Sequence, residues 1–260
     1  MNVVLFADHE IGYEITDFVL NNLHPHLLKI KAVFTTNNNG RMWWKGLEDL
    51  CSEHSIPFFR YEDSKEKVHA FSEVNYFFLL SWKYLMSSEE VGVPKNGVIN
   101  LHYSLLPEYR GVYPVNWAII EGKQKTGVTY HLIDHNIDCG TIICAREEVI
   151  HPWDTSRTLQ KRLDSVALNL FPQMLEHLNC AKFSNKITES RSSSGNYYSR
   201  RRFEKIGEIN LSGLYKAETL INLLRGMSFL ETTPTCFFID SESGEKIYLH
   251  LNLSSSKEAE

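Results

Sequence analysis

The amino-acid sequence predicts an α/β fold, a doubly wound and mostly parallel sheet followed by a small C-terminal region with a helix and a β-hairpin. Three observations support this prediction. Short apolar runs without strict alternation recur along the first half of the chain, as in strands that are covered on both faces. Helix-like segments separate these runs, which is typical of parallel strands. Polar residues follow several of the runs, where ligands of such folds bind.

Five apolar runs predict the first five strands. They occupy Val3–Phe6, Ile30–Thr35, Pro57–Arg60, Tyr76–Ser81 and Val98–His102. The fourth run is apolar on both sides, so we expect it near the centre of the sheet. Helices are expected at Tyr13–Asn22 and Met42–Glu53.

The next elements complete the sheet. Pro114–Glu121 is expected to be a helix, with Gly122 as its C-cap. Two further strands, Thr126–Ile133 and Thr141–Val149, flank the polar loop Asp134–Gly140. A long helix follows at Thr155–Leu178, where leucine, valine and methionine recur with helical spacing.

A polar, serine-rich stretch at Glu189–Asn196 indicates a surface loop or linker. We therefore predict a catalytic domain over residues 1–182 and a small C-terminal region over residues 183–260. Within that region, Lys216–Met227 predicts an amphipathic helix. The runs Thr235–Ile239 and Lys246–Leu251, joined by a polar turn, predict a β-hairpin.

Charge and cysteine content disfavour several classes of protein. The chain has 260 residues, of which 43% are hydrophobic, and a formal net charge of -5. It lacks the overall basic excess of proteins that mainly bind nucleic acid, so we expect no nucleic-acid partner. The five cysteines form no CxxC pair, so we expect neither a disulfide framework nor a metal site. No signal peptide or membrane span is evident, which predicts a cytoplasmic protein with no membrane partner.

Asn100 and His102 are the first candidates for chemistry. They alternate at the end of a strand, so both side chains share one face of the sheet. Histidine can take a proton from an attacking amine near neutral pH, and an asparagine amide can stabilise a developing oxyanion. Asp138, in the polar loop, could orient His102 and relay protons, although aspartate is also common in turns. This set of residues suits acyl transfer.

The motif around these residues resembles that of the folate-dependent formyltransferase family. It comprises Asn100-x-His102-x-Ser-Leu-Leu-Pro, then Arg110-Gly111, then Asp138-x-Gly140. The resemblance covers roughly residues 1–180 and implies a Rossmann-like core, N10-formyltetrahydrofolate as formyl donor and a primary amine as acceptor. It places Asn100, His102 and Asp138 in the family's catalytic positions.

The C-terminal region is similar to that of nucleotide-sugar N-formyltransferases. The resemblance lies in Asn196-Tyr197-Tyr198-Ser199-Arg200-Arg201 and in the hairpin that follows. It implies a dTDP-linked amino-dideoxysugar as acceptor, such as dTDP-4-amino-4,6-dideoxyglucose, and a role in surface polysaccharide or O-antigen synthesis. It also implies a homodimer that forms through the hairpin region.

We expect cations and aromatic side chains near the acceptor's pyrophosphate and base. The candidate acceptor contacts are Lys83, Asp8, His9, Tyr103, Arg110, Tyr197 and Tyr198. The two tyrosines of the tail could instead pack it onto the rest of the chain, and Arg110 could make a structural ion pair. The resemblance implies folate contacts at Trp82, Tyr84, Leu85, Met86, Asp134, His135 and Ile137.

Three alternatives remain open at this point. The acceptor could be another small amine, or the enzyme could be similar to methionyl-tRNA formyltransferase, although the acidic chain disfavours tRNA. Outside the enzyme class, the chain could be an inactive module that binds a nucleotide sugar. An activity assay with defined acceptors separates the three.

Overall fold

The structure is a computed structural model, and it describes residues 1–37, 46–180, 195–229, 235–249, 251 and 253. The chain divides into two compact units, each assembled from separate stretches of sequence. The first unit comprises Met1–His102, Thr129–Cys144 and Ala167–Arg191, and the second comprises Tyr103–Val128, Ala145–Val166 and Ser192–Glu260. The predicted domain boundary near residue 182 lies outside the described residues and stays a prediction.

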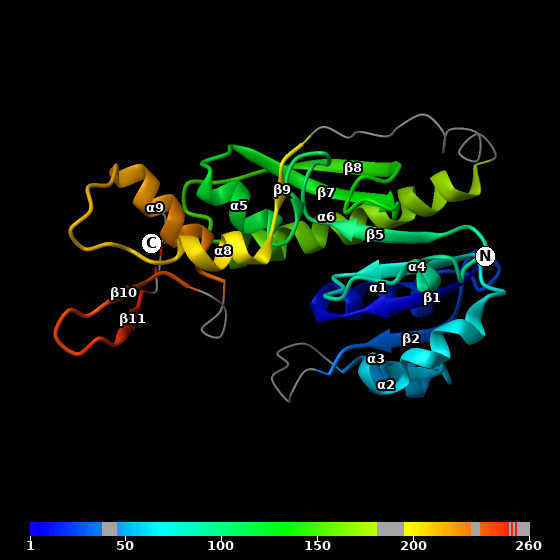
Figure 1. Cartoon of the computed structure of the whole chain (residues 1–260). Coiled ribbons are helices and arrows are strands. Elements are labelled where there is room, and N and C mark those ends of the chain that lie inside the picture. Colours follow the sequence, from blue (N-terminus) through cyan, green and yellow to red (C-terminus); the bar gives the residue numbers. More distant parts are fainter. Residues whose placement is uncertain (38–45, 181–194, 230–234, 250, 252, 254–260) are drawn as a thin grey trace. The chain divides into compact units, whose positions relative to one another are not determined.

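The structure contains a seven-stranded sheet in the order β3-β2-β1-β4-β5-β7-β8, and its first five strands in that order lie wholly in the first unit (Figure 1). Its strands are β1 (Asn2–Ala7), β2 (Lys29–Thr35), β3 (Phe58–Arg60), β4 (Tyr76–Leu80), β5 (Val98–His102), β7 (Lys125–Leu132) and β8 (Ile142–Val149). The first five strands pair in parallel, and β7 runs antiparallel to β5. The prediction of a mostly parallel sheet with the fourth strand at its centre is confirmed.

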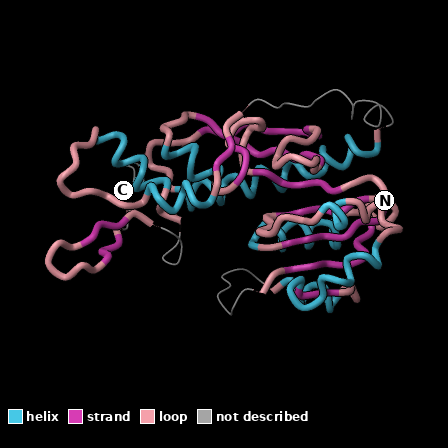
Figure 2. The backbone as a smooth tube through the Cα atoms, in the orientation of Figure 1, coloured by secondary structure: helices cyan, strands magenta, loops and turns pink. Residues whose placement is uncertain are grey.

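Helices and strands alternate along the first unit (Figure 2). The expected helices are present as α1 (His9–Asn22), α2 (Leu47–Glu53) and α6 (Ser156–Asn179), and α6 continues across both units. The first residues of the predicted helix Met42–Glu53 lie outside the described residues. Three short helices were not expected: α3 (Tyr61–Ser64), the 3-10 helix η1 (Lys65–Phe71) and α4 (Ser88–Val91). Elements of this length are too short to produce a periodic apolar stripe.

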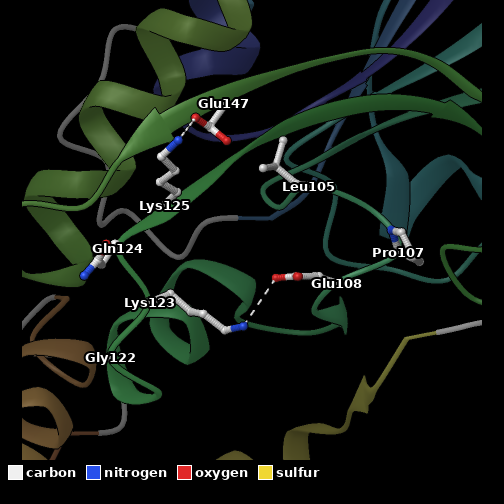
Figure 3. A pocket seen from close by; sticks show the side chains of 8 residues that line it. All are labelled: Leu105, Pro107, Glu108, Gly122, Lys123, Gln124, Lys125 and Glu147. Carbon is white, nitrogen blue, oxygen red and sulfur yellow. Dashed lines mark hydrogen bonds and ion pairs between the residues drawn. The ribbon is translucent and has the colours of Figure 1, made fainter.

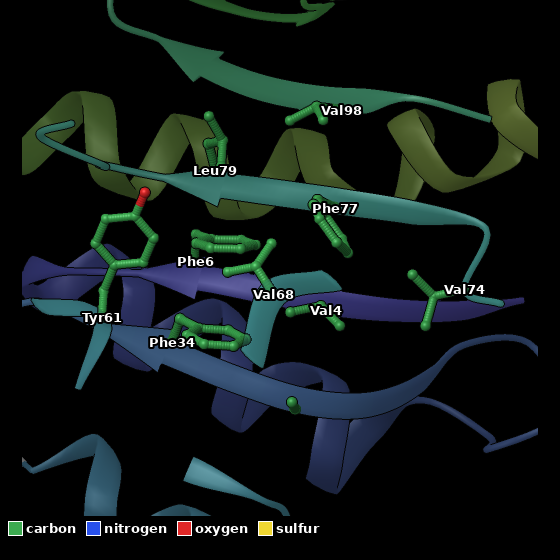
Figure 4. Close-up of a cluster of buried hydrophobic side chains, with 10 residues drawn as sticks. Val4, Phe6, Phe34, Tyr61, Val68, Val74, Phe77, Leu79 and Val98 are labelled. Atoms are coloured by element: carbon green, nitrogen blue, oxygen red, sulfur yellow. The ribbon is translucent and has the colours of Figure 1, made fainter. Parts of the chain in front are cut away.

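Alternation along β4 divides the core of the first unit between the two faces of the sheet. Phe77 and Leu79 point to one face, where they join a buried cluster with Phe6, Phe34 and Val68 (Figure 4). On the other face, the ring of Phe78 lies 6.0 Å from that of Phe171 in α6. Burial of each such side chain contributes about 1.5–3 kcal/mol. Helical segments therefore cover both faces, as the doubly wound prediction requires.

The second unit contains α5 (Pro114–Ile120), α8 (Arg200–Ile206) and α9 (Ala217–Gly226). The C-cap of α5 is Glu121, and the predicted glycine, Gly122, follows it with a left-handed backbone (φ +67°), the usual place of a glycine that ends a helix. Ser199 caps α8, since its side chain accepts a hydrogen bond from the Arg202 backbone N–H at 3.3 Å. The predicted hairpin is present as β10 (Phe237–Ile239) and β11 (Lys246–Tyr248), which pair antiparallel.

Two short strands in the second unit were not predicted. β6 (Arg110–Gly111) pairs in parallel with β9 (Tyr197–Tyr198), which joins segments far apart in the sequence. A Cβ atom at Gly111 would collide with the carbonyl oxygen of Tyr198, so only glycine permits this close approach. In the described part of the chain, no helix is long and apolar enough to cross a membrane.

Candidate active site

Two of the predicted catalytic side chains approach the third, Asp138, at the end of β5. The Asp138 Oδ2 atom lies 3.7 Å from His102 Nδ1, and its Oδ1 atom accepts a long hydrogen bond of 3.5 Å from Asn100 Nδ2. The side chains of His102 and Asp138 are largely buried. Low solvent access strengthens the interaction between an imidazole and a carboxylate. The structure thus brings together residues that the sequence could only suggest as a set.

The loop between β7 and β8 is shaped to present Asp138. The backbone of Asp138 is left-handed (φ +51°), a strained conformation that aspartate tolerates better than most residues. Gly140 follows two residues later, where a Cβ atom would collide with the carbonyl oxygen of Leu132. The Asp-x-Gly motif therefore has a structural reason, because the glycine lets the loop close against β7.

His131 was not predicted as a site residue, yet it contacts two of them. It is 1% exposed and faces Asn100 across the antiparallel pairing of β5 and β7. Its Nδ1 atom lies 2.9 Å from the carbonyl oxygen of Leu132, which can only accept, so Nδ1 carries the proton. In the neutral ring, Nε2 is then an acceptor, and it receives the Asn100 amide N–H at 3.2 Å. Its Nε2 atom also lies 3.5 Å from Asp138 Oδ1. The strand register is the signal that could have revealed it.

Asp8 and His9 follow β1 at the same edge of the sheet. The buried Asp8 carboxylate accepts hydrogen bonds from the Thr35 hydroxyl (2.9 Å) and from the backbone N–H and hydroxyl of Thr36 (3.0 and 2.8 Å). It therefore ties the end of β1 to the end of β2. The backbone of His9 is left-handed (φ +59°), as is that of Ser81. The His9 Nδ1 atom lies 2.8 Å from the Ser81 hydroxyl. Burial lowers the pKa of His9, and Asp8 opposes this shift.

The residues after β4 have partners on the adjacent α3. The Lys83 Nζ atom lies 3.7 Å from Glu62 Oε1, and the same oxygen accepts a hydrogen bond of 2.7 Å from the Tyr84 hydroxyl. Burial opposes ionisation of Glu62, but the hydrogen bond from Tyr84 and two from backbone N–H groups lower its pKa. Lys83 is partly exposed, so its ammonium group can exchange this partner for a ligand anion.

The remaining candidate folate contacts lie in the same unit. The ring of Trp82 packs edge-on against Phe6 and Tyr61, and Met86 packs against the same core cluster. Leu85 is largely exposed. Three further candidates, Asp134, His135 and Ile137, lie in the loop that presents Asp138, and the Asp134 carboxylate accepts the His135 N–H at 2.6 Å.

Four predicted acceptor contacts belong to the second unit, and three of them make hydrogen bonds to other residues of that unit. Tyr198 is 2% exposed, and its hydroxyl donates to Glu121 at 2.8 Å. The Tyr103 hydroxyl donates to Asp164 at 2.5 Å, and Arg110 donates to the carbonyl oxygen of Gly195 at 2.6 Å. Tyr197 is 49% exposed. For Tyr198 the geometry supports the packing alternative, whereas Tyr197 retains an accessible ring.

A shallow pocket of about 580 Å³ lies in the second unit (Figure 3). It is lined by Leu105, Pro107, Glu108, Gly122, Lys123, Gln124, Lys125 and Glu147. The two lysines pair with the two glutamates, at 3.8 Å for Lys123 and Glu108 and 2.6 Å for Lys125 and Glu147. None of these residues belongs to the predicted site. Among the described residues, no group of three or more His, Cys, Asp or Glu is placed to hold a metal ion.

Two family models match the sequence. The formyl transferase model matches residues 59–175, and the model of the N-formyltransferase dimerization C-terminal domain matches residues 202–255. A bifunctional polymyxin resistance protein ArnA from Wigglesworthia glossinidia brevipalpis is 30% identical over 233 residues. The match spans 88% of this chain and 35% of that protein, so the chain covers about a third of this relative.

Several solved structures are similar over most of the chain. A 4-N formyltransferase from Francisella tularensis has a TM-score of 0.78 at 21% identity, and a sugar N-formyltransferase from Shewanella sp FDAARGOS_354 has 0.76 at 23%; each match covers 98% of both chains. An N-formyltransferase from Helicobacter canadensis has a TM-score of 0.66 at 23% identity, over 87% of this chain and 80% of that one. At these identities the likeness shows the fold.

Proposed function

The chain belongs to the formyl transferase family, and on that premise we propose that it transfers a formyl group from N10-formyltetrahydrofolate to the amino group of a dTDP-linked amino-dideoxysugar. The observation that carries the proposal is the approach of Asn100 and His102 to the Asp138 carboxylate, in a chain whose C-terminal part matches N-formyltransferases. The Helicobacter canadensis structure, a complex with folinic acid and dTDP-3-aminofucose, supports both substrate classes.

Each of the three residues has a distinct role in the proposed reaction. His102 takes a proton from the acceptor amine as its nitrogen attacks the formyl carbon, and the nearby Asp138 stabilises the resulting imidazolium. The Asn100 amide stabilises the oxyanion that develops on the formyl oxygen. Asn100 makes a hydrogen bond of 3.2 Å to His131 and a longer, weaker one of 3.5 Å to Asp138. The formyl oxygen replaces Asp138 as the acceptor, while His131 keeps the amide oriented. His102 then passes the proton to the leaving N10 nitrogen.

Both substrates would bind around the carboxyl ends of the strands. Lys83 exchanges Glu62 for the pyrophosphate, and His9 contacts the sugar. The exposed ring of Tyr197 suits stacking on the thymine base. The loop Trp82–Met86 and the residues Asp134, His135 and Ile137 would hold the folate. The preferred acceptor is dTDP-4-amino-4,6-dideoxyglucose, and the product serves surface polysaccharide or O-antigen synthesis.

The protein acts as a homodimer in this proposal. The matched C-terminal model describes a dimerization domain, and its hairpin exposes the apolar side chains of Ile239, Ile247 and Tyr248. Exposed apolar side chains gathered on one short hairpin favour contact with another protein surface.

An activity assay tests the proposed function. Purified protein with N10-formyltetrahydrofolate and dTDP-4-amino-4,6-dideoxyglucose should yield the N-formylated sugar, detected by mass spectrometry. The variant His102→Asn should lose about 1,000-fold or more in kcat, as expected when a general base is removed, and keep its affinity for dTDP. A matched control is His177→Asn, because His177 lies in α6 and its ring binds a backbone carbonyl oxygen.

The acceptor panel separates the remaining alternatives. It should include dTDP-3-amino sugars, UDP-linked amino sugars, glycinamide ribonucleotide and methionyl-tRNA. Turnover of a different amine with none of the dTDP-linked sugar would overturn the acceptor assignment. Binding of a nucleotide sugar with no turnover of any acceptor would instead identify a binding module.

A further inference from the structure

A buried carboxylate, Glu90, supports the loop that follows β4. Glu90 is 1% exposed and lies in the four-residue helix α4. Its Oε2 atom accepts the backbone N–H of Ser87 at 2.7 Å, and the Ser87 hydroxyl accepts the Glu90 N–H at 3.2 Å. These two hydrogen bonds form a capping box, so the C-terminal end of the loop is held in place.

The other carboxylate oxygen of Glu90 reaches the loop through Tyr61. The Tyr61 hydroxyl donates to Glu90 Oε1 at 2.6 Å. The Tyr61 ring lies edge-on against Trp82 with centroids 5.1 Å apart, and stacks on Tyr84 at 5.6 Å. One buried carboxylate thus holds Ser87 directly and two aromatic residues of the loop indirectly.

Capping alone does not account for a buried charge at this position. An exposed glutamate or a glutamine completes a capping box equally well, whereas desolvating a carboxylate is costly unless hydrogen bonds compensate. Here the Glu90 carboxylate receives hydrogen bonds from three groups of two residues: the Tyr61 hydroxyl, the Ser87 backbone N–H and the Ser87 hydroxyl, which also accepts the Glu90 N–H. Despite burial, which opposes ionisation, these donors lower the pKa of Glu90, so it is a charged acceptor at neutral pH.

We propose that Glu90 is a positioning residue for folate, which acts through Ser87 and Tyr61 to hold the backbone of Tyr84–Met86 in its binding conformation. The inference rests on the proposed function, in which this loop contacts the folate. Glu90 itself touches no substrate. Its removal should affect the folate more than the nucleotide, because Leu85 and Met86 lie next to Ser87 whereas Lys83 lies close to the end of β4 and pairs with Glu62.

Direct binding of 5-formyltetrahydrofolate, measured by calorimetry, tests the proposal without need of turnover. Glu90→Ala should raise the Kd for the folate about tenfold, the effect of losing one or two hydrogen bonds, and change the Kd for dTDP less than threefold. Glu90→Gln, which keeps an acceptor for Ser87, should restore most of the folate affinity. Tyr61→Phe should give a Kd for the folate between those of the wild type and Glu90→Ala. Glu89→Ala is the matched control, because Glu89 is exposed on the same helix.

The outcomes distinguish this inference from the proposed function. A wild-type protein that does not bind the folate contradicts the proposed function itself. If the wild type binds it and Glu90→Ala, folded by circular dichroism, binds equally well, Glu90 has no positioning role. Equal losses of folate and dTDP affinity would also overturn the inference, because they indicate general loosening of the unit.

Discussion

At the scale of single residues, His131 orients the side-chain amide of Asn100, the residue proposed to stabilise the oxyanion. In the neutral ring, the proton faces the Leu132 carbonyl oxygen, so the other nitrogen accepts from Asn100. That acceptor determines which way the Asn100 amide is turned. An amide in the opposite orientation would direct its oxygen toward His131 Nε2 and Asp138 Oδ1, both of which are acceptors.

We expect His131→Phe to lower kcat about 10- to 100-fold and to leave the KM for the sugar nucleotide nearly unchanged. The half-buried Asn100 amide loses the stronger of its two hydrogen bonds, which orients it, and such a loss costs about 1–3 kcal/mol. His177→Phe is the matched control, since His177 Nδ1 makes a similar 2.9 Å bond to the Ile143 carbonyl oxygen. An unchanged kcat in His131→Phe, measured under saturating folate, would contradict this role.

At this scale, the sequence predicts the placement of residues that share one element. Asn100 and His102 alternate on one strand, so their common face follows from the sequence. The same reasoning did not reveal that Asp8 is buried against Thr35 and Thr36, or that Glu121 accepts from Tyr198. These partners are distant in sequence, and no local pattern encodes them.

At the scale of elements, an ion-pair network joins the start of α6 to α9 in the second unit. Buried Asp154 accepts two hydrogen bonds from Arg162, at 2.6 and 2.9 Å, and one from the His151 N–H. Arg225 of α9 donates to the backbone carbonyl oxygens of Asp154 and His151, each at 2.7 Å. Burial raises the pKa of Asp154, but the donors outweigh it and lower the pKa overall.

This network predicts acid sensitivity. A depressed folded-state pKa means that Asp154 contributes its full stability above the ordinary aspartate pKa of about 3.9, and loses it as pH falls through the folded-state value. The free energy of unfolding, measured with urea between about pH 7 and pH 3, should therefore fall less steeply in Asp154→Asn than in the wild type.

At neutral pH, Asp154→Asn should be less stable than the wild type by about 2 kcal/mol, because Arg162 loses its buried partner but keeps Glu148. Glu147→Gln is a suitable comparison. Its pair with Lys125 is as short, at 2.6 Å, but both side chains are exposed, so its loss should cost less than about 0.5 kcal/mol. Equal losses of stability in Asp154→Asn and Glu147→Gln would show that burial does not strengthen the Asp154–Arg162 ion pair.

The strands of the main sheet and the long helices were predictable from the sequence, whereas the short helices were not. The apolar runs located the seven strands, and β4 was expected at the centre because it is apolar on both sides. The helices α3 and α4 contain four residues each and present no periodicity, yet Tyr61, Glu62 and Glu90 lie in them. For the same reason, the residues that support the β4 loop were absent from the predicted site.

At the scale of the whole molecule, the proposed homodimer makes a direct prediction. One chain has a mass of 30.1 kDa, so the dimer should have a mass of about 60 kDa in solution. The double variant Tyr248→Glu and Ile247→Glu should have the mass of a single chain, because dimer formation would bury its new charges. Light scattering after size-exclusion chromatography measures this. Leu27→Glu, an exposed leucine of the first unit, should leave the mass unchanged. A wild type that is monomeric at micromolar concentration would contradict the dimer.

The discontinuous make-up of the two units has a consequence for gene exchange. The chain passes between them five times, and β7, β8 and α6 each contribute residues to both. No contiguous gene segment encodes either unit, so a single crossover between residues 103 and 191 would exchange parts of both. Chimaeras that graft the acceptor preference of one relative onto another should therefore be assembled from several matched segments, with junctions outside those three shared elements.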